Sequence, residues 1–202
     1  LALLRGLVKD KNGKALLVQR WFSLAHRCPD CRYIVRTDAS PFGMGAILFA
    51  AGKPVSWCAA EWTSADCALF KAKPGDPDLQ AGWQLRAILM AIDVWLTIRK
   101  DEAVMLAQSD ATAALFASRR GSGRTPAMNA LCAEVAIRIE SAMPVFHVEH
   151  YEGVINFEAD ALSRLSQGAA VPGRLRENPW QPLRPRSASF FWAWPRDLVE
   201  TA

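Results

Sequence analysis

The sequence predicts an α/β domain in which a mixed sheet is flanked by helices. Three observations favour this fold class. Short β-favouring segments separated by glycine and proline turns come first, an amphipathic helix follows, and strands and helices then alternate. The 202 residues, 51% hydrophobic and 22% charged, suffice for one well-packed domain with extensions, whereas two full domains would be cramped. We therefore expect a single folded core.

Residues 1–31 precede this core, and we interpret them as a partly helical connector. Residues 14–27 place apolar side chains at near-helical spacing and contain no Gly or Pro, which predicts a helix. Cys28 and Cys31 form a single CxxC without a second ligand pair. A turn that carries two thiols is the default interpretation, and a zinc site is the alternative.

Three short segments then predict an antiparallel meander. Residues 32–37 are rich in β-favouring side chains and run directly into Asp38, so this carboxylate is expected at a strand end. Glycine and proline turns lead into strands at 46–50 and 55–58.

A long loop and an amphipathic helix follow the meander. Residues 63–79 are rich in Asp, Lys, Pro and Gly without periodicity, which predicts a loop. Residues 82–99 repeat apolar side chains at helical spacing, so one face of this helix should lie on the core. Gln84 is expected in the first turn, on that inward face.

The remaining pattern alternates strand and helix. Residues 103–108 predict a buried strand that ends at Asp110, and 111–118 a short helix. Thr125 and Pro126 are typical of a helix start. The further elements are expected at 125–142 (helix), 145–149 (strand) and 156–165 (helix), followed by a proline-rich extended tail at 166–202.

Three acids are candidates for a metal site. Asp38 and Asp110 follow predicted strands, where α/β folds place their ligand crevices, and Asp160 lies on the closing helix. Magnesium prefers oxygen ligands and retains several waters, so a few carboxylates together with substrate phosphate oxygens are enough to hold it. An aspartate at a strand end is commonly only a turn residue, but three such positions in one pattern favour metal binding.

These motifs, in order and spacing, resemble the ribonuclease H domain of gypsy-like and related LTR-type retroelement reverse transcriptases. The similarity covers roughly residues 32–165. It is carried by Thr37-Asp38-Ala39-Ser40 with Gly43, Gly45 and Ala46, by Ser109-Asp110, and by His150-x-x-Gly153-x-x-Asn156-x-x-Ala159-Asp160-Ala161-Leu162-Ser163-Arg164.

The resemblance implies a ribonuclease H-like mixed five-stranded sheet and a two-metal-ion hydrolysis of the RNA strand in RNA/DNA hybrids. It implies that Asp38 bridges two Mg²⁺ ions, that Asp110 helps to hold one, and that Asp160 holds the other; Mn²⁺ can substitute. The ions, ~3.5–4 Å apart, would stabilise the attacking and leaving oxygens. Contacts that read the 2′-hydroxyl and the hybrid's shape would select RNA.

Gln84 departs from this pattern, because the family has a glutamate there. A glutamine offers a neutral carbonyl oxygen, so affinity for a second ion should fall. The alternative to an active enzyme is therefore a catalytically impaired module with a structural or hybrid-binding role. Another nuclease or a transposase on the same fold would need a different acid pattern.

The resemblance also implies roles for neighbouring residues. His150 is interpreted as shaping the strand-to-helix turn, and proton transfer is the alternative. Ser40 and Asn156 are expected to contact the hybrid. Arg119, Arg120 and Arg124 form a basic loop that either grips phosphates or is simply solvated.

The tail and the composition complete these expectations. Aromatic residues of the tail either stack on bases or dock onto the domain, and docking is favoured.

The five cysteines form no even framework, and neither a membrane span nor a signal peptide is apparent. We expect no membrane association and an intracellular location, in the cytoplasm or nucleus. The resemblance implies an RNA/DNA hybrid and the polymerase part of the parent reverse transcriptase as partners. No polymerase-type Tyr-x-Asp-Asp appears, so we do not expect this chain itself to synthesise DNA.

Overall fold

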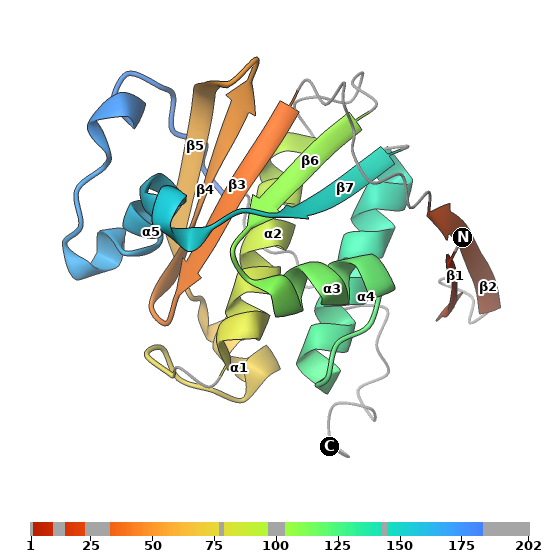
Figure 1. Ribbon diagram of the computed structural model, residues 1–202. Coiled ribbons are helices and arrows are strands. Elements are labelled where there is room, and N and C mark those ends of the chain that lie inside the picture. Colours follow the sequence, from red (N-terminus) through yellow and green to blue (C-terminus); the bar gives the residue numbers. More distant parts are fainter. Residues whose placement is uncertain are drawn as a thin grey trace.

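A five-stranded mixed sheet forms the centre of the molecule (Figure 1). The computed structural model describes residues 2–9, 15–22, 33–76, 79–96, 104–142 and 145–183. The strand order is β5-β4-β3-β6-β7, with β3–β4 and β4–β5 antiparallel and β3–β6 and β6–β7 parallel. The strands are β3 (Tyr33–Ser40), β4 (Gly43–Ala50), β5 (Lys53–Glu61), β6 (Val104–Ser109) and β7 (Val145–His150).

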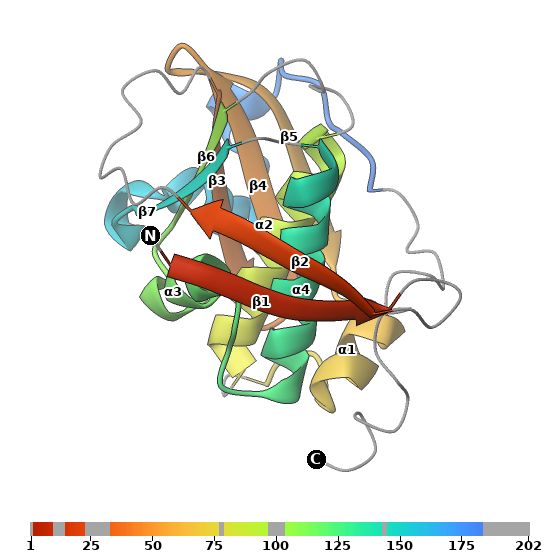
Figure 2. The same ribbon diagram turned by 90° about the vertical axis from the view of Figure 1, so that its right-hand side faces the viewer.

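Helices cover both faces of this sheet. Figure 2 shows α2 and α4 running side by side, and α2 packs on β3 and β4. Helix α5 packs on the same two strands and belongs to a separate apolar cluster. The helices are α1 (Ser64–Phe70), α2 (Gln80–Leu96), α3 (Thr112–Arg120), α4 (Pro126–Ala142) and α5 (Phe157–Ser163). This arrangement places β3 between two helical layers.

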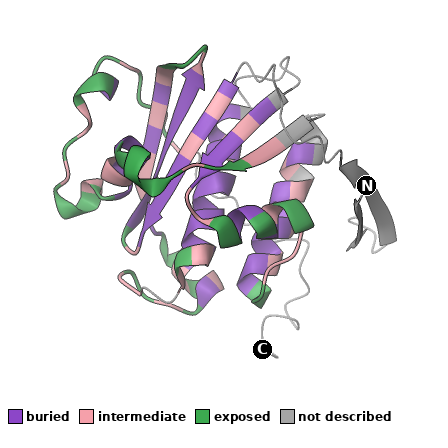
Figure 3. Cartoon of the chain, in the orientation of Figure 1, coloured by how far each residue is buried: buried purple, intermediate pink, exposed green. Residues whose placement is uncertain are grey.

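Helix α2 is the central element of the larger core. Figure 3 shows it buried along most of its length, and Trp83, Ile88 and Trp95 are fully buried. The Trp83 ring stacks on Trp62 at 4.3 Å between centroids, and Trp95 Nε1 donates to Ser56 Oγ at 2.8 Å. A helix buried this completely between the sheet and α4 has little freedom to shift, so its inward residues are held firmly.

Two segments differ from the sequence-based expectation. The helix expected at 14–27 was wrong over Ala15–Phe22, which is strand β2, paired with β1 (Ala2–Lys9). Apolar runs fit both periods, and Asn12-Gly13, a typical hairpin turn sequence, was the missed signal. The loop expected at 63–79 contains α1. A capping box begins this helix: Thr63 Oγ1 accepts from the Asp66 N–H, and Asp66 Oδ2 accepts from the Thr63 N–H.

The other elements lie close to the predicted positions. Helix α2 begins at Gln80 rather than Gly82, so Gln84 lies in its second turn instead of its first. Thr125 Oγ1 accepts from the Met128 N–H, which confirms the predicted start of α4.

In the described part of the chain no helix has the length and apolarity to cross a membrane. The described cysteines Cys58, Cys67 and Cys132 are free, and Cys28 and Cys31 lie outside the described residues.

The segment expected to be an extended tail folds back on the domain as far as the structure describes it. It contains two short 3-10 turns, Leu165–Gln167 and Gly173–Leu175. Leu175 is fully buried in the cluster beneath α5, together with Phe49 and Leu162. Residues 166–183 thus pack on the domain, but through Leu175 rather than through an aromatic side chain, because Trp180 is 54% exposed. The aromatic residues at 190–194 lie outside the described residues.

Replacing Leu175 with Ala should test this docking. Because the side chain is fully buried, Leu175→Ala should lower the free energy of unfolding by about 2–5 kcal/mol, measured by urea denaturation. Val154→Ala, at a position 89% exposed, is the matched control and should change it by less than about 0.5 kcal/mol. Equal effects of the two substitutions would show that the segment does not pack as described.

Candidate active site around Asp38

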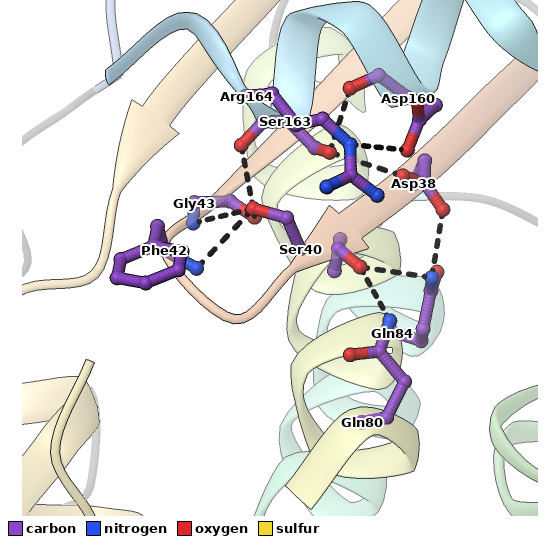
Figure 4. Close-up of polar contacts among 10 residues, drawn as sticks. Asp38, Ser40, Phe42, Gly43, Gln80, Gln84, Asp160, Ser163 and Arg164 are labelled. Carbon is purple, nitrogen blue, oxygen red and sulfur yellow. Dashed lines mark hydrogen bonds and ion pairs between the residues drawn. The ribbon is translucent and has the colours of Figure 1, made fainter. Parts of the chain in front are cut away.

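Asp38 lies on β3 at the point where α2 and α5 approach the sheet (Figure 4). Its side chain is only 5% exposed. Gln84 Nε2, from α2, donates to Oδ1 at 2.8 Å. Ser163 Oγ, from α5, donates toward Oδ2 at 3.0 Å and shares its one hydrogen with the Asp160 carbonyl at 2.8 Å. Each carboxylate oxygen therefore has a buried donor from a different helix.

Burial dominates the electrostatics of this carboxylate. It raises the pKa of Asp38 above its usual range, and the hydrogen bond from Gln84 opposes this rise. The negative charge of Asp110 raises the pKa further, the bond from Ser163 lowers it, and Asp160 also raises it. Asp110 and Asp160 are thus near enough for their charges to act on Asp38.

Asp110 follows β6 directly and has an oxygen without a partner. Within the described residues, its buried Oδ1 accepts no hydrogen bond. Burial raises the pKa of Asp110, a backbone hydrogen bond and the charge of His150 oppose this, and Asp160 raises it again. Gly153 lies so close that a Cβ there would be 2.9 Å from Asp110 Oδ2. A buried carboxylate oxygen without a donor is the kind of atom that binds a cation.

Asp160 is the most open of the three acids. Its side chain is 46% exposed, and Oδ1 accepts from Arg164 Nε, one helical turn later, at 2.8 Å. Among the described residues, no three His, Cys, Asp or Glu side chains lie close enough together to hold one metal ion. Asp38, Asp110 and Asp160 therefore influence one another through their charges without forming a closed ligand set.

Ser40 and Asn156, expected to contact nucleic acid, are buried and bonded within the protein. Ser40 is 1% exposed, and its Oγ donates to the Ser163 carbonyl at 2.8 Å. Asn156 is 3% exposed, and its Nδ2 donates to the Thr37 carbonyl at 3.0 Å. As the structure shows them, both side chains fasten α5 and its preceding turn to β3.

His150 and the basic loop are exposed, in contrast. His150 ends β7, before the turn that leads to α5, and its charge lowers the pKa of Asp110. Arg119 and Arg120 end α3, and Arg124 precedes α4. Arg120 Nε donates to Ser122 Oγ at 3.0 Å. Since α3 starts two residues after Asp110, its last turn lies about 12 Å further along the helix axis.

A polar row that the sequence did not predict crosses the adjacent strands β3, β6 and β7. Arg36 Nε donates to Gln108 Oε1 at 3.0 Å, and Gln108 Nε2 donates to Glu149 Oε2 at 2.9 Å. The Arg36 guanidinium also lies 4.4 Å from the Phe49 ring centre and 4.1 Å from that of Tyr151. Arg36 and Gln108 each stand two residues before a site aspartate, so the row fixes the strands relative to one another.

Ser163 was quoted in the closing motif but was given no role by the sequence. It bonds Asp38 through Oγ, and its carbonyl accepts from Ser40. A polar residue three positions after Asp160 lies on the same helical side, and this spacing was the available signal.

Comparison with solved structures identifies the fold as that of ribonuclease H. RNase H1 from the halophilic archaeon Halobacterium salinarum NRC-1 aligns with a TM-score of 0.54 at 12% identity, over 69% of this chain and 99% of that chain. LC11-RNase H1, solved in complex with an RNA/DNA hybrid, aligns with a TM-score of 0.53 at 14% identity, over 64% and 92%. The predicted mixed five-stranded sheet with flanking helices is confirmed. The sequence itself matches no family model and no curated protein.

Substituting Gly45 should test the close packing of α5 on the sheet. A Cβ at Gly45 would lie 2.4 Å from Leu162 Cβ and 2.7 Å from the Ala159 carbonyl oxygen, so α5 must move away. We expect Gly45→Ala to lower the free energy of unfolding by about 1–3 kcal/mol in urea denaturation. Gly173→Ala is the control, because nothing lies within 4 Å of the added atom. If both variants are as stable as the wild type, α5 does not pack this closely.

The raised pKa of Asp38 predicts a pH dependence. A group whose folded pKa is raised contributes stability that is complete below its ordinary pKa and is lost as pH rises through the raised pKa. In EDTA, the unfolding free energy of the wild type should therefore fall relative to that of Asp38→Asn as pH rises from below about 4. Urea denaturation across pH measures the difference. A difference that is constant, or grows in favour of the wild type, would contradict this account of Asp38.

Proposed function

We propose that this chain is a ribonuclease H-type endonuclease that hydrolyses the RNA strand of RNA/DNA hybrids with divalent metal ions. The observation that carries the proposal is the position of Asp38 in a ribonuclease H fold, where it is buried and where the charges of Asp110 and Asp160 raise its pKa. Carboxylates collected at the carboxyl ends of adjacent parallel strands are a typical place for ligands in α/β sheets.

The metal assignment rests on the chemistry of these side chains. Asp38 and Asp110 are partly or fully removed from water and repel each other, and Asp110 retains a buried oxygen without a donor among the described residues. Oxygen ligands of this kind suit Mg²⁺, and Mn²⁺ as a substitute. When bound, such ions supply the positive charge that activates water and stabilises the leaving oxygen in a two-ion mechanism.

Residues around the acids have supporting roles in this proposal. Ser163 and Gln84 orient Asp38, and the Arg36 row keeps β3, β6 and β7 in register. The exposed Arg119, Arg120 and Arg124, beyond the far end of α3, would bind backbone phosphates of the duplex. LC11-RNase H1 was solved with an RNA/DNA hybrid, and the shared fold makes the same class of substrate the natural one to test here.

The cellular setting forms part of the proposal and rests on the motif resemblance. We propose that the chain belongs to a retroelement reverse transcriptase, acts beside the polymerase part of that protein, and works inside the cell. The supporting residues are the Thr37-Asp38-Ala39-Ser40 and Ala159-Asp160-Ala161-Leu162-Ser163-Arg164 motifs, which lie on β3 and at α5.

A second function is favoured by one observation. Because Gln84 gives Asp38 an amide donor where the family has a carboxylate, the chain is also a candidate for a non-catalytic, hybrid-binding module. Cleavage and binding of the same hybrid distinguish the two functions.

Cleavage of an end-labelled RNA/DNA hybrid in Mg²⁺ or Mn²⁺ tests the proposed activity. The wild type should cut the RNA strand, and Asp110→Asn should reduce the rate at least about a hundredfold, the scale expected for losing a group that acts in the reaction. Glu177→Gln, an exposed carboxylate in the docked tail, is the control and should keep the wild-type rate. Equal rates in Asp110→Asn and the wild type would place the reaction elsewhere. Hybrid binding without metal-dependent cleavage would favour the non-catalytic module.

A further inference from the structure

The Gln84 side chain is enclosed by partners on every polar atom. It is 2% exposed, and Nε2 donates to Asp38 Oδ1 at 2.8 Å and to the Ala39 carbonyl at 3.2 Å. Ser109 Oγ donates to Oε1 at 3.2 Å. Figure 4 shows the amide directed at the end of β3, between Asp38 and the carbonyl drawn beside it. Both hydrogens of the Nε2 group are thus donated to acceptors.

The direction of this amide is fixed by its neighbours. Ser109 Oγ accepts from the Ala111 N–H, so its own hydrogen remains for the bond to Gln84 Oε1. Turning the amide over would place Oε1 against two acceptors, Asp38 Oδ1 and the Ala39 carbonyl. The same turn would leave the Ser109 hydroxyl facing an N–H group. The observed orientation is therefore the one that satisfies every partner.

An amide N–H cannot bind a cation, and here it occupies the oxygen of Asp38 nearest to Gln84. A cation on that oxygen would have to displace the N–H of a side chain that is 2% exposed. Asp110, in contrast, keeps a buried oxygen without a donor among the described residues, and the donor to Asp160 Oδ1 is the half-exposed Arg164.

We propose that Gln84 is a positioning residue whose amide holds Asp38 in the place of a second cation, so that the free protein binds one divalent ion and not two. The inference rests on the proposed metal-dependent function and specifies how that site differs from one with a glutamate at residue 84. Without metal, hydrogen bonds hold the Asp38 carboxylate in place. The partly positive N–H group of Gln84 then lies against Asp38 Oδ1, where a second cation would otherwise lie.

Counting bound Mn²⁺ tests this role without measuring cleavage. Calorimetric titration, with the free Mn²⁺ signal followed by electron paramagnetic resonance, should give one ion per chain for the wild type. Gln84→Glu should bind two, with affinity for the second raised at least about tenfold by the added charge. Two neighbouring ions should also produce the spin coupling that one ion lacks.

Gln80→Glu is a matched control. Gln80 lies one turn earlier on α2, and its Nε2 donates to the same Ala39 carbonyl, so the variant adds the same charge beside the site without touching Asp38. It should still bind one ion. Circular dichroism of each variant verifies that it is folded, and the wild-type count alone tests the proposal if Gln84→Glu does not fold.

The outcomes separate this inference from the proposed function. Two ions in the wild type, or equal counts in Gln84→Glu and Gln80→Glu, would overturn the role of Gln84 and leave the metal-dependent function standing. No bound Mn²⁺ in the wild type or in either folded variant would overturn the proposed function itself, and the inference with it.

Discussion

The burial of the Asp38 carboxylate is the constraint that organises this end of the molecule. A charge removed from water is costly unless donors meet it, and here one donor comes from each side of the sheet. Gln84 can reach Asp38 because α2 is immobilised within the core, and Ser163 can because α5 approaches β4 at a glycine. The packing of both helical layers is therefore coupled to the state of a single side chain.

Sequence alone predicted much of the fold and the positions of the three acids. Strand segments with β-favouring residues and glycine turns are local signals, and Asp38 and Asp110 follow from them. The missed elements, α1 and β2, also had local signals, the capping box at Thr63 and Asp66 and the Asn12-Gly13 sequence between two strands that pair. The orientation of the Gln84 amide could not be predicted, because Asp38, Ala39 and Ser109 surround it only after folding.

The three acids of the candidate site differ in how firmly the protein holds them, so they differ in how readily each carboxylate can reorient. Asp38 is fixed from two helices, whereas Asp160 is half exposed and paired with an exposed Arg164. Exposed ion pairs are weak and exchange readily, so Asp160 can reorient at little energetic cost. Asp110 lies between these extremes, directly after a strand whose register with β3 is supported by Arg36 and Gln108.

The segment of residues 166–183 that packs on the domain also affects how readily the domain would aggregate. Strand β5 lies at the border of the sheet, and Trp57 within it donates its N–H to the Pro179 carbonyl and accepts from the Gln181 N–H. The segment thus occupies backbone groups that another copy of the chain would otherwise pair with. A version of the protein ending near residue 165 would expose these groups together with the apolar pocket that Leu175 fills, and intermolecular strand pairing would become its characteristic hazard.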